Sequence, residues 1–204
     1  MRRGLYLVTP DWDDTKHLIA VSRAAIEGGA TVLQYRHKTA SPALRLEQAG
    51  ALRTLTRELG AFFIVNDDLE LALAVAADGL HAGRDDGEVA ALKTASNGRL
   101  EIGVSCYNDF DRARAAHAAG ADYVAFGAMY ASPTKPHAPS APVELISRAR
   151  RELGARVACI GGITADNAAP LVEAGADWVA VISDIYQAAD PRAQAERIAR
   201  LFHP

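Results

Sequence analysis

The stretch Gly120-Ala-Asp-Tyr-Val-Ala125 recurs as Gly175-Ala-Asp-Trp-Val-Ala180. Two related junctions precede them, Gly29-Ala-Thr-Val-Leu-Gln34 and Ala77-Asp-Gly-Leu-His-Ala82. Each junction follows an alanine-rich helical pattern and opens a run of β-branched or aromatic residues. The spacing is roughly 45–55 residues, about twice the length of one strand–helix unit. The repeat therefore indicates a chain built from paired β/α units.

Other short apolar runs lie between these junctions and complete an alternation of strands and helices. The predicted strands are Leu5–Val8, Thr31–Arg36, Ala61–Asn66, Gly79–Ala82, Glu101–Ser105, Tyr123–Gly127, Arg156–Gly161 and Trp178–Ile182. Amphipathic segments predicted as helices include Thr15–Glu27, Ala43–Leu59, Phe110–Ala119 and Val143–Leu153. Strict alternation with continuously apolar strands is typical of a parallel sheet covered by helices. We expect an α/β fold, a compact (β/α)₈ TIM barrel over residues 1–204 as a single catalytic domain. A doubly wound open sheet is the alternative.

Composition limits the classes of function. Half of the 204 residues are hydrophobic, 23% are charged, the formal net charge is −3 and the pI is near 6.1. These values argue against nucleic acid or an anionic membrane as a partner, so any attraction for phosphate has to be local. No apolar stretch approaches a membrane span, and the first strand begins without a signal peptide, so we expect a cytoplasmic protein. Cys106 and Cys159 fall in strand-like runs and are predicted to be reduced.

The barrel geometry separates structural from functional residues. Asp78, Asp122 and Asp177 of the junctions precede strands, at the N-terminal end of the barrel, where special residues serve stability. Side chains just past the C-terminal strand ends line the mouth, where barrel enzymes perform their chemistry. This rule selects the candidates.

The second strand ends in Gln34-Tyr-Arg-His-Lys38. Because side chains alternate along a strand, Gln34, Arg36 and Lys38 share one face. That face points into the mouth if Tyr35 packs against the helices. Two cations and an amide on one face suit a diphosphate, although a solvated strand end is the plainer interpretation.

Carboxylates follow the next two strands. Asp67 ends the third strand and Asp86 lies in the loop after the fourth, with Asp68 and Asp85 as competitors. Two such carboxylates can share one Mg²⁺ with phosphate oxygens and water, or they can simply cap helices. Ser105, which ends the predicted fifth strand, either bonds a phosphate or caps the next helix.

Two further segments look like anion cradles. Ser132-Pro-Thr-Lys135 offers two hydroxyls and an ammonium group, and the pair Gly161-Gly162 exposes backbone N–H groups. With Ile182-Ser183 after the last strand, the glycine pair matches the recurrent phosphate site of (β/α)₈ barrels. Two cradles indicate an enzyme that handles two phosphorylated small molecules, or one large one.

Taken in order, these residues resemble the thiamine phosphate synthase family over nearly the whole chain. The matching pieces are Tyr6-Leu-Val-Thr9, Gln34-Tyr-Arg-His-Lys38, Val65-Asn-Asp67, Ala77-Asp-Gly-Leu-His81, Gly103-Val-Ser105, Gly120-Ala-Asp-Tyr-Val124, Ser132-Pro-Thr-Lys135, Ile160-Gly-Gly-Ile163 and Ala180-Val-Ile-Ser183. The resemblance implies condensation of a hydroxymethylpyrimidine diphosphate with a thiazole phosphate, or its carboxylated form, to give thiamine phosphate and pyrophosphate.

The resemblance also implies roles for single residues. The pyrimidine diphosphate would be held by Gln34, Arg36, Lys38, Asn66, Ser105 and Lys135. The thiazole phosphate would be held by Ser132, Thr134, Gly162, Ile182 and Ser183. Asp67 and Asp86 would bind one Mg²⁺ per subunit, and Arg36, Ser105 and Lys135 would act in catalysis. The family reaction is thought to begin with cleavage of the C–O bond, which needs charge neutralisation more than a general base. A homo-oligomer is compatible with this assignment.

The chain departs from the family pattern at three positions. Ser132 replaces a common threonine, and Ala82 and Arg84 stand where the family usually has leucine and glutamine. Arg84 adds a cation beside Asp86, which bears on the geometry of that loop. Two rival functions remain at this point: a related thiazole tautomerase, which needs neither diphosphate nor magnesium, and a non-catalytic protein that binds thiamine phosphate.

Overall fold

The computed structural model describes residues 1–83, 87–131 and 141–202. Within this part of the chain, eight parallel strands close into a barrel in sequence order, with β1 paired to both β2 and β8. The strands are β1 (Gly4–Val8), β2 (Ala30–Tyr35), β3 (Phe62–Asn66), β4 (Gly79–Ala82), β5 (Glu101–Tyr107), β6 (Tyr123–Phe126), β7 (Val157–Ile160) and β8 (Trp178–Val181). The predicted (β/α)₈ barrel is confirmed, and the closed strand order excludes the open sheet.

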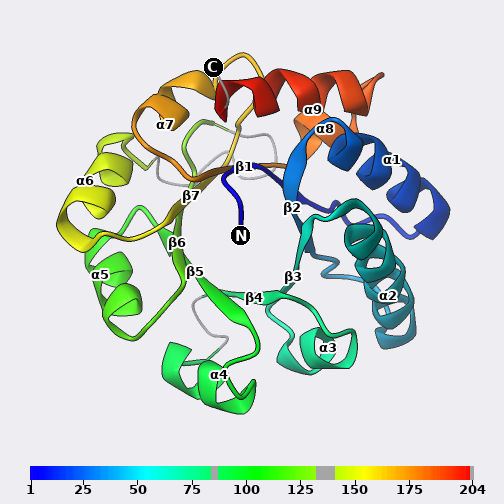
Figure 1. Ribbon diagram of the computed structural model, residues 1–204, viewed down its shortest axis with the longest axis horizontal. Coiled ribbons are helices and arrows are strands. Elements are labelled where there is room, and N and C mark those ends of the chain that lie inside the picture. The colour runs from blue at the N-terminus through cyan, green and yellow to red at the C-terminus, as the bar shows by residue number, and fades with distance from the viewer. Residues whose placement is uncertain (84–86, 132–140, 203–204) are drawn as a thin grey trace.

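Helices surround the barrel (Figure 1). They are α1 (Thr15–Glu27), α2 (Pro42–Leu59), α3 (Leu69–Ala74), α4 (Val89–Ala95), α5 (Phe110–Ala118), α6 (Glu144–Leu153), α7 (Ala169–Glu173), α8 (Ser183–Tyr186) and α9 (Pro191–Ala199), followed by a short 3₁₀ turn, Arg200–Phe202. Local chemistry sets several ends. The side chains of Asp14, Ser41 and Asp109 cap α1, α2 and α5, and left-handed glycines, Gly60 and Gly154, end α2 and α6.

The predicted strands lie within two residues of the observed ones at either end. The largest difference is β5, which continues past Ser105 to Tyr107. The register of β5 against β6 shifts between these two residues, and Tyr107 adopts a positive φ of 56°. This irregularity is invisible in a hydrophobic pattern, because it is a property of strand pairing rather than of one strand.

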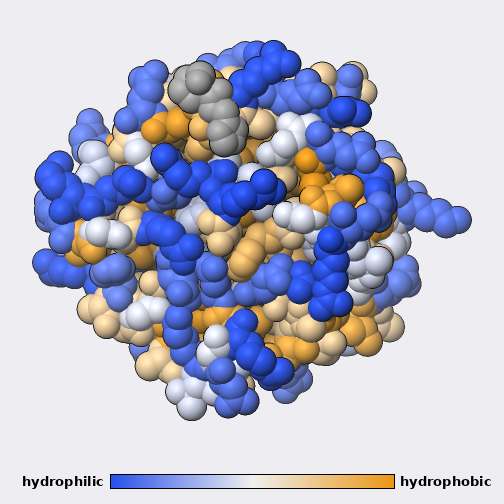
Figure 2. Space-filling model, viewed as in Figure 1, coloured by the Kyte–Doolittle hydropathy of each residue, from blue (hydrophilic) through white to orange (hydrophobic). Residues whose placement is uncertain are grey.

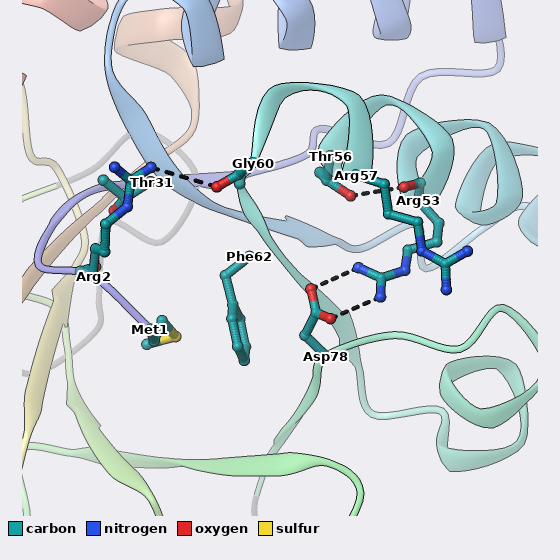
Figure 3. A pocket seen from close by; sticks show the side chains of 10 residues that line it. Met1, Arg2, Thr31, Arg53, Thr56, Arg57, Gly60, Phe62 and Asp78 are labelled. Carbon is teal, nitrogen blue, oxygen red and sulfur yellow. Dashed lines mark hydrogen bonds and ion pairs between the residues drawn. The ribbon is translucent and has the colours of Figure 1, made fainter.

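The aspartates of the repeated junctions hold the N-terminal ends of the strands together. Both oxygens of Asp78 bind the guanidinium of Arg53 on α2, at 2.6 and 2.7 Å (Figure 3). One oxygen also accepts a hydrogen bond from the backbone N–H of Phe63, the second residue of the neighbouring β3. The carboxylate thus joins a loop, a helix and a strand, and charge-assisted bonds of this kind are the strong ones.

The same arrangement, an aspartate bound to a cation on a helix and to a backbone N–H of a strand, recurs along the chain, as the repeat predicts. Asp122 binds Lys93 of α4 at 2.7 Å and accepts from the N–H of Ile102 in β5. Asp177 binds Arg150 of α6 at 2.7 Å and accepts from the N–H of Val157, the first residue of β7. The prediction that these aspartates serve structure at this end of the barrel is therefore confirmed.

Two buried layers follow from the alternation of side chains along the strands. A large cluster fills the space between barrel and helices, and it contains residues such as Leu33, Val65 and Val124. A smaller cluster, with Tyr6, Tyr123 and Trp178, fills the interior of the barrel. The N-terminus lies over the centre of the barrel in Figure 1, where Met1 packs against the inner cluster. The barrel is consequently a packed core and not a pore.

Across residues 1–83, 87–131 and 141–202, no helix is both long and apolar enough to span a membrane. On the face seen in Figure 2, hydrophilic residues dominate and apolar colour appears only in small patches between them.

Candidate active site

A cavity of about 670 Å³ opens beside the C-terminal ends of β2 and β3. Its lining includes four of the predicted site residues, Arg36, Lys38, Asn66 and Asp67, which come from two different strand ends. The mouth residues selected from the strand ends thus include two cations and a carboxylate that line one cavity. A second cavity, of about 370 Å³, lies at the opposite end of the barrel around Arg53 and Asp78 (Figure 3). The structural ion pair described above occupies its wall.

Residues that follow β1 hold the segment after β2 that carries Arg36 and Lys38. The backbone N–H of Arg36 donates to Oγ1 of Thr9, at 2.8 Å, and Thr9 donates back to the carbonyl of Arg36. Asp11 accepts from the backbone N–H of Lys38 at 2.9 Å and lies 3.3 Å from Nη1 of Arg36. The side chain of Tyr35 packs outward against α2, where its hydroxyl donates to Gln48. The predicted division of this segment into an inner and an outer face is confirmed.

Asp11 and Thr9 were not predicted as site residues. They follow β1, so the strand-end rule covers their position, but neither is a cation and neither stands in a phosphate-binding pattern. Their role is visible only when the ends of β1 and β2 are placed side by side.

The capping role proposed for Asp67 belongs to its neighbour. The side chain of Asp68 accepts from the N–H of Leu71 at 2.9 Å, which caps α3, and Asp68 also pairs with Arg45. Asp67 instead has a positive φ of 61°, and its Oδ2 lies 3.5 Å from Nζ of Lys38. A left-handed backbone at a residue other than glycine costs about 1–2 kcal/mol. Asp67 is therefore strained into a position at the cavity wall, which a capping role would not require.

Ser105 does not cap a helix either, since Asp109 caps α5. Its Oγ lies 2.8 Å from Nε2 of His81, which projects from β4 into the barrel. Nδ1 of His81 lies 2.9 Å from the hydroxyl of Tyr123, and that hydroxyl lies 2.9 Å from the hydroxyl of Tyr6. Nε2 of Gln34 donates to Tyr6 at 2.7 Å and completes a chain across the barrel. Burial raises the pKa of both phenols above the ordinary value, so both stay protonated.

His81 was not predicted as a site residue. Strand alternation alone was sufficient to place the side chain. Its partners come from β5 and β6, and no local pattern identifies them.

The glycine pair after β7 forms a tight turn beside the loop that follows β6. Gly161 and Gly162 have φ values of 108° and 63°. A Cβ on Gly162 would lie 2.5 Å from the carbonyl oxygen of Ala131 and 2.8 Å from that of Tyr130, so only glycine fits. Asn167 fixes the turn, because its Nδ2 donates to the carbonyl of Gly162 at 2.9 Å. Sequence reasoning missed Asn167.

The residues after β8 lie near this turn. Ile182 is half-buried and Ser183 is exposed at the start of α8. The carboxylate of Asp184 accepts from the backbone N–H of Ala165 at 2.9 Å, which ties α8 to the loop after the glycine pair. The segment after β8 and the glycine turn are thus parts of one corner of the mouth.

Four predicted site residues, Asp86, Ser132, Thr134 and Lys135, lie outside the described residues. Within the described ranges, no three histidine, cysteine, aspartate or glutamate side chains gather in a way that could hold a metal ion. Both cysteines, Cys106 and Cys159, are buried free thiols, as the sequence predicted.

A closed (β/α)₈ barrel with cations, a carboxylate and a glycine turn at its C-terminal mouth is typical of barrel enzymes that act on phosphorylated compounds. Residues 5–185 match the family model described as thiamine monophosphate synthase. The chain belongs to this family, and it is accordingly a transferase.

Individual relatives agree with the family match. The chain is 54% identical to the thiamine-phosphate synthase of Aromatoleum aromaticum, across 98% of this chain and 96% of the relative. It is 53% identical to that of Azoarcus sp. strain BH72, across 98% and 97%. A solved structure, thiamine phosphate pyrophosphorylase from Pyrococcus furiosus, superposes with a TM-score of 0.87 at 34% identity, covering 98% of this chain and 95% of the other. Orotidine 5′-phosphate decarboxylase from Pyrococcus horikoshii, with a TM-score of 0.72 at 18% identity over 97% and 99% of the two chains, shares the fold alone.

Proposed function

We propose that this chain is a thiamine phosphate synthase. It would join a hydroxymethylpyrimidine diphosphate to a thiazole phosphate, or to its carboxylated form, with release of pyrophosphate and, from the carboxylated form, also of CO₂. The observation that carries the proposal is the family match over residues 5–185, combined with a mouth cavity lined by Arg36, Lys38, Asn66 and Asp67. In this proposal residues 1–204 act as one catalytic domain.

The diphosphate would lie against the cations of the mouth. Arg36 offers a guanidinium fork and Lys38 an ammonium group, and both line the cavity. Lys135 would add a third positive charge from the loop after β6. Asp11 accepts from the backbone N–H of Lys38 and pairs with the side chain of Arg36, so the backbone of this segment and the Arg36 guanidinium are positioned before a substrate binds. Gln34, Asn66 and Ser105 would contact the pyrimidine part.

Magnesium would bind at Asp67 and Asp86. The Asp67 carboxylate fits this role, since it is a hard oxygen ligand on the wall of the cavity that Arg36 and Lys38 also line. Mg²⁺ commonly uses one or two carboxylates and completes its shell with phosphate oxygens and water, so a crowded cluster of protein ligands is not needed. When bound, the ion neutralises charge on the diphosphate. Lys38, now 3.5 Å from Asp67, can then turn its ammonium group to the substrate.

The thiazole phosphate would occupy the opposite corner of the mouth. Gly162 has room for a close anion because it lacks a side chain, and Asn167 holds its turn. Ser132 and Thr134 would add hydroxyl donors, and Ile182 and Ser183 would complete the site after β8.

The reaction needs a leaving group whose developing charge is neutralised. Arg36, Lys38 and Lys135 would stabilise the departing pyrophosphate, so that the C–O bond breaks before the new bond forms. The thiazole nitrogen then captures the pyrimidine carbocation. Ser105 would contact the pyrimidine during this step. Positioning and electrostatics would supply most of the acceleration, and no general base is required.

The test is product formation from the two substrates, with Mg²⁺ and with EDTA. Magnesium-dependent thiamine phosphate and pyrophosphate would support the proposal. No product from folded protein and intact substrates would refute it.

A pair of adjacent variants tests the metal ligand. Asp67→Asn should raise the Mg²⁺ concentration that gives half-maximal rate. Asp68→Asn, which keeps an oxygen to cap α3 and removes only the ion pair with Arg45, should cost at most about 1 kcal/mol of stability and leave the Mg²⁺ dependence unchanged. Equal Mg²⁺ dependence in both variants would remove Asp67 from the metal site.

A further inference from the structure

A continuous hydrogen-bond chain crosses the interior of the barrel beneath the mouth. It runs from Gln34 on β2 through Tyr6 on β1, Tyr123 on β6 and His81 on β4 to Ser105 on β5, with steps of 2.7, 2.9, 2.9 and 2.8 Å. The first four residues are buried, at most 9% exposed, whereas Ser105 is half-buried. The two ends of the chain are the residues proposed above to contact the pyrimidine.

The amide of Gln34 sets the direction of every hydrogen bond in the chain. Its Nε2 can only donate, so the Tyr6 oxygen accepts and the single hydrogen of Tyr6 is left for Tyr123. Tyr123 in turn gives its hydrogen to Nδ1 of His81. A neutral imidazole then carries its proton on Nε2 and donates it to Oγ of Ser105. Ser105 keeps its own hydroxyl hydrogen to donate elsewhere.

The packing around Tyr123 holds this chain in place. Gly103 of β5 lies against the phenol, and a Cβ there would overlap Cζ and the hydroxyl oxygen of Tyr123. The Tyr123 ring also lies 5.7 Å from the rings of both His81 and Trp178. Both phenols are neutral, so each hydroxyl has one hydrogen to donate. A buried hydroxyl that finds no acceptor for this hydrogen lowers the stability of the folded state.

We propose that Tyr6, Tyr123 and His81 are positioning residues that couple Gln34 to Ser105 and fix their hydrogen-bonding roles as acceptor and donor. The proposal rests on the proposed function for the identity of the ligand. The amide nitrogen of Gln34 donates to Tyr6, which leaves the amide oxygen to accept a hydrogen bond from the ligand. Ser105 accepts from His81, which leaves its hydroxyl to donate.

This pair of roles selects a class of ring. An aminopyrimidine offers an amino hydrogen to Gln34 and, across the ring, the lone pair of N1 to Ser105. The 4-oxo form keeps that lone pair, because its ring proton lies on N3. An oxo-pyrimidine needs a donor from Gln34 instead, so the amide must turn over. Because the chain is continuous, that turn would reverse Tyr6, Tyr123 and the tautomer of His81 together, and Ser105 would lose its role as donor.

The tautomer of His81 tests the chain without any substrate. Two-bond ¹H–¹⁵N spectra of the histidine side chains distinguish a proton on Nε2 from one on Nδ1, and His81→Asn assigns the signal. We expect His81 protonated on Nε2 in the native protein. Tyr123→Phe, which keeps the ring against Gly103 but cuts the chain, should give a mixture of tautomers.

Tyr35→Phe is the matched control. Tyr35 is a buried tyrosine whose hydroxyl donates to Gln48 outside the barrel, at 3.0 Å, so this variant loses a buried hydroxyl without touching the chain. It should keep the native tautomer. A native His81 protonated on Nδ1 would overturn the proposal outright.

The substrate test compares kcat/KM for the 4-amino pyrimidine diphosphate with that for its 4-oxo analogue. The ratio should fall about tenfold in Tyr123→Phe, because Gln34 can then turn without reversing Ser105, and one unpaired buried group is worth about that factor. The KM for the thiazole phosphate and the ratio in Tyr35→Phe should stay unchanged. A Tyr123→Phe ratio equal to that of Tyr35→Phe would overturn the coupling. Absence of turnover in all proteins would refute the proposed function, and the spectra would still decide the chain.

Discussion

Gly103→Ala is the substitution for which the structure predicts the clearest effect. The added methyl group would overlap Cζ and the hydroxyl oxygen of Tyr123, far inside the 3.0 Å that real Cβ contacts respect. Tyr123 cannot move aside easily. It is 1% exposed, its ring packs edge-on against Tyr6, and its hydroxyl makes two hydrogen bonds.

The cost has two parts. Overpacking a tight core costs about 1–3 kcal/mol. If Tyr123 is displaced, its bonds to Tyr6 and His81 are also lost, at about 1 kcal/mol each. We therefore expect Gly103→Ala to lower the free energy of unfolding by about 3–5 kcal/mol, a large part of the 5–15 kcal/mol that is typical of a domain.

Urea denaturation followed by circular dichroism measures this change, with the slope checked for two-state behaviour. Gly50→Ala is the control, because Gly50 lies inside α2 with nothing within 4 Å of an added Cβ, and alanine there should stabilise by about 0.5–1 kcal/mol. In a Tyr123→Leu background, Gly103→Ala should cost much less. The same penalty in both backgrounds, or a Gly103→Ala protein as stable as the parent, would refute the reasoning.

Three further predictions concern charge and burial. Arg36→Ala should lower turnover by about 10²–10³-fold, the scale for one preorganised charge, as steady-state assays would report, and near-normal turnover would remove its proposed role. Asp177→Ala should cost about 2–3 kcal/mol in urea, because it strands a buried backbone N–H in β7, with kcat/KM unchanged since the residue lies far from the mouth. Burial raises the folded-state pKa of the Tyr123 and Tyr186 phenols above the unfolded value of about 10. Their contribution is therefore complete below about pH 10 and is lost above it, by about 1.4 kcal/mol per pH unit per phenol, and a flat stability between about pH 9 and 11 would contradict this.

Most of the fold could be predicted from local pattern. The eight apolar runs and the amphipathic stretches between them are features of single segments, and so is the repeated junction that contains Asp122 and Asp177. Such features can be recognised without knowing which segments pack together. The strand-end rule then selected Arg36, Lys38 and Asp67, and these three side chains line one cavity in the structure.

One question that the sequence left open, which residue caps α3, was settled by backbone geometry. Whether Asp67 or Asp68 caps α3 depends on one dihedral angle, since Asp67 takes a positive φ and Asp68 does not. Adjacent aspartates have the same composition and nearly the same local pattern. Only the folded backbone distinguishes them.

By itself, then, the sequence determined the alternation of strands and helices, the family resemblance and the end of the barrel that carries the candidate site. The tertiary structure alone decided the partners: Asp11 beneath Arg36 and Lys38, and the chain of His81 and Tyr123 inside the barrel. The physical reason is that hydrophobic periodicity is a property of a single segment and can be recognised from that segment alone. Hydrogen bonds between strand ends depend on closure of the barrel, which brings together residues that are far apart in the chain.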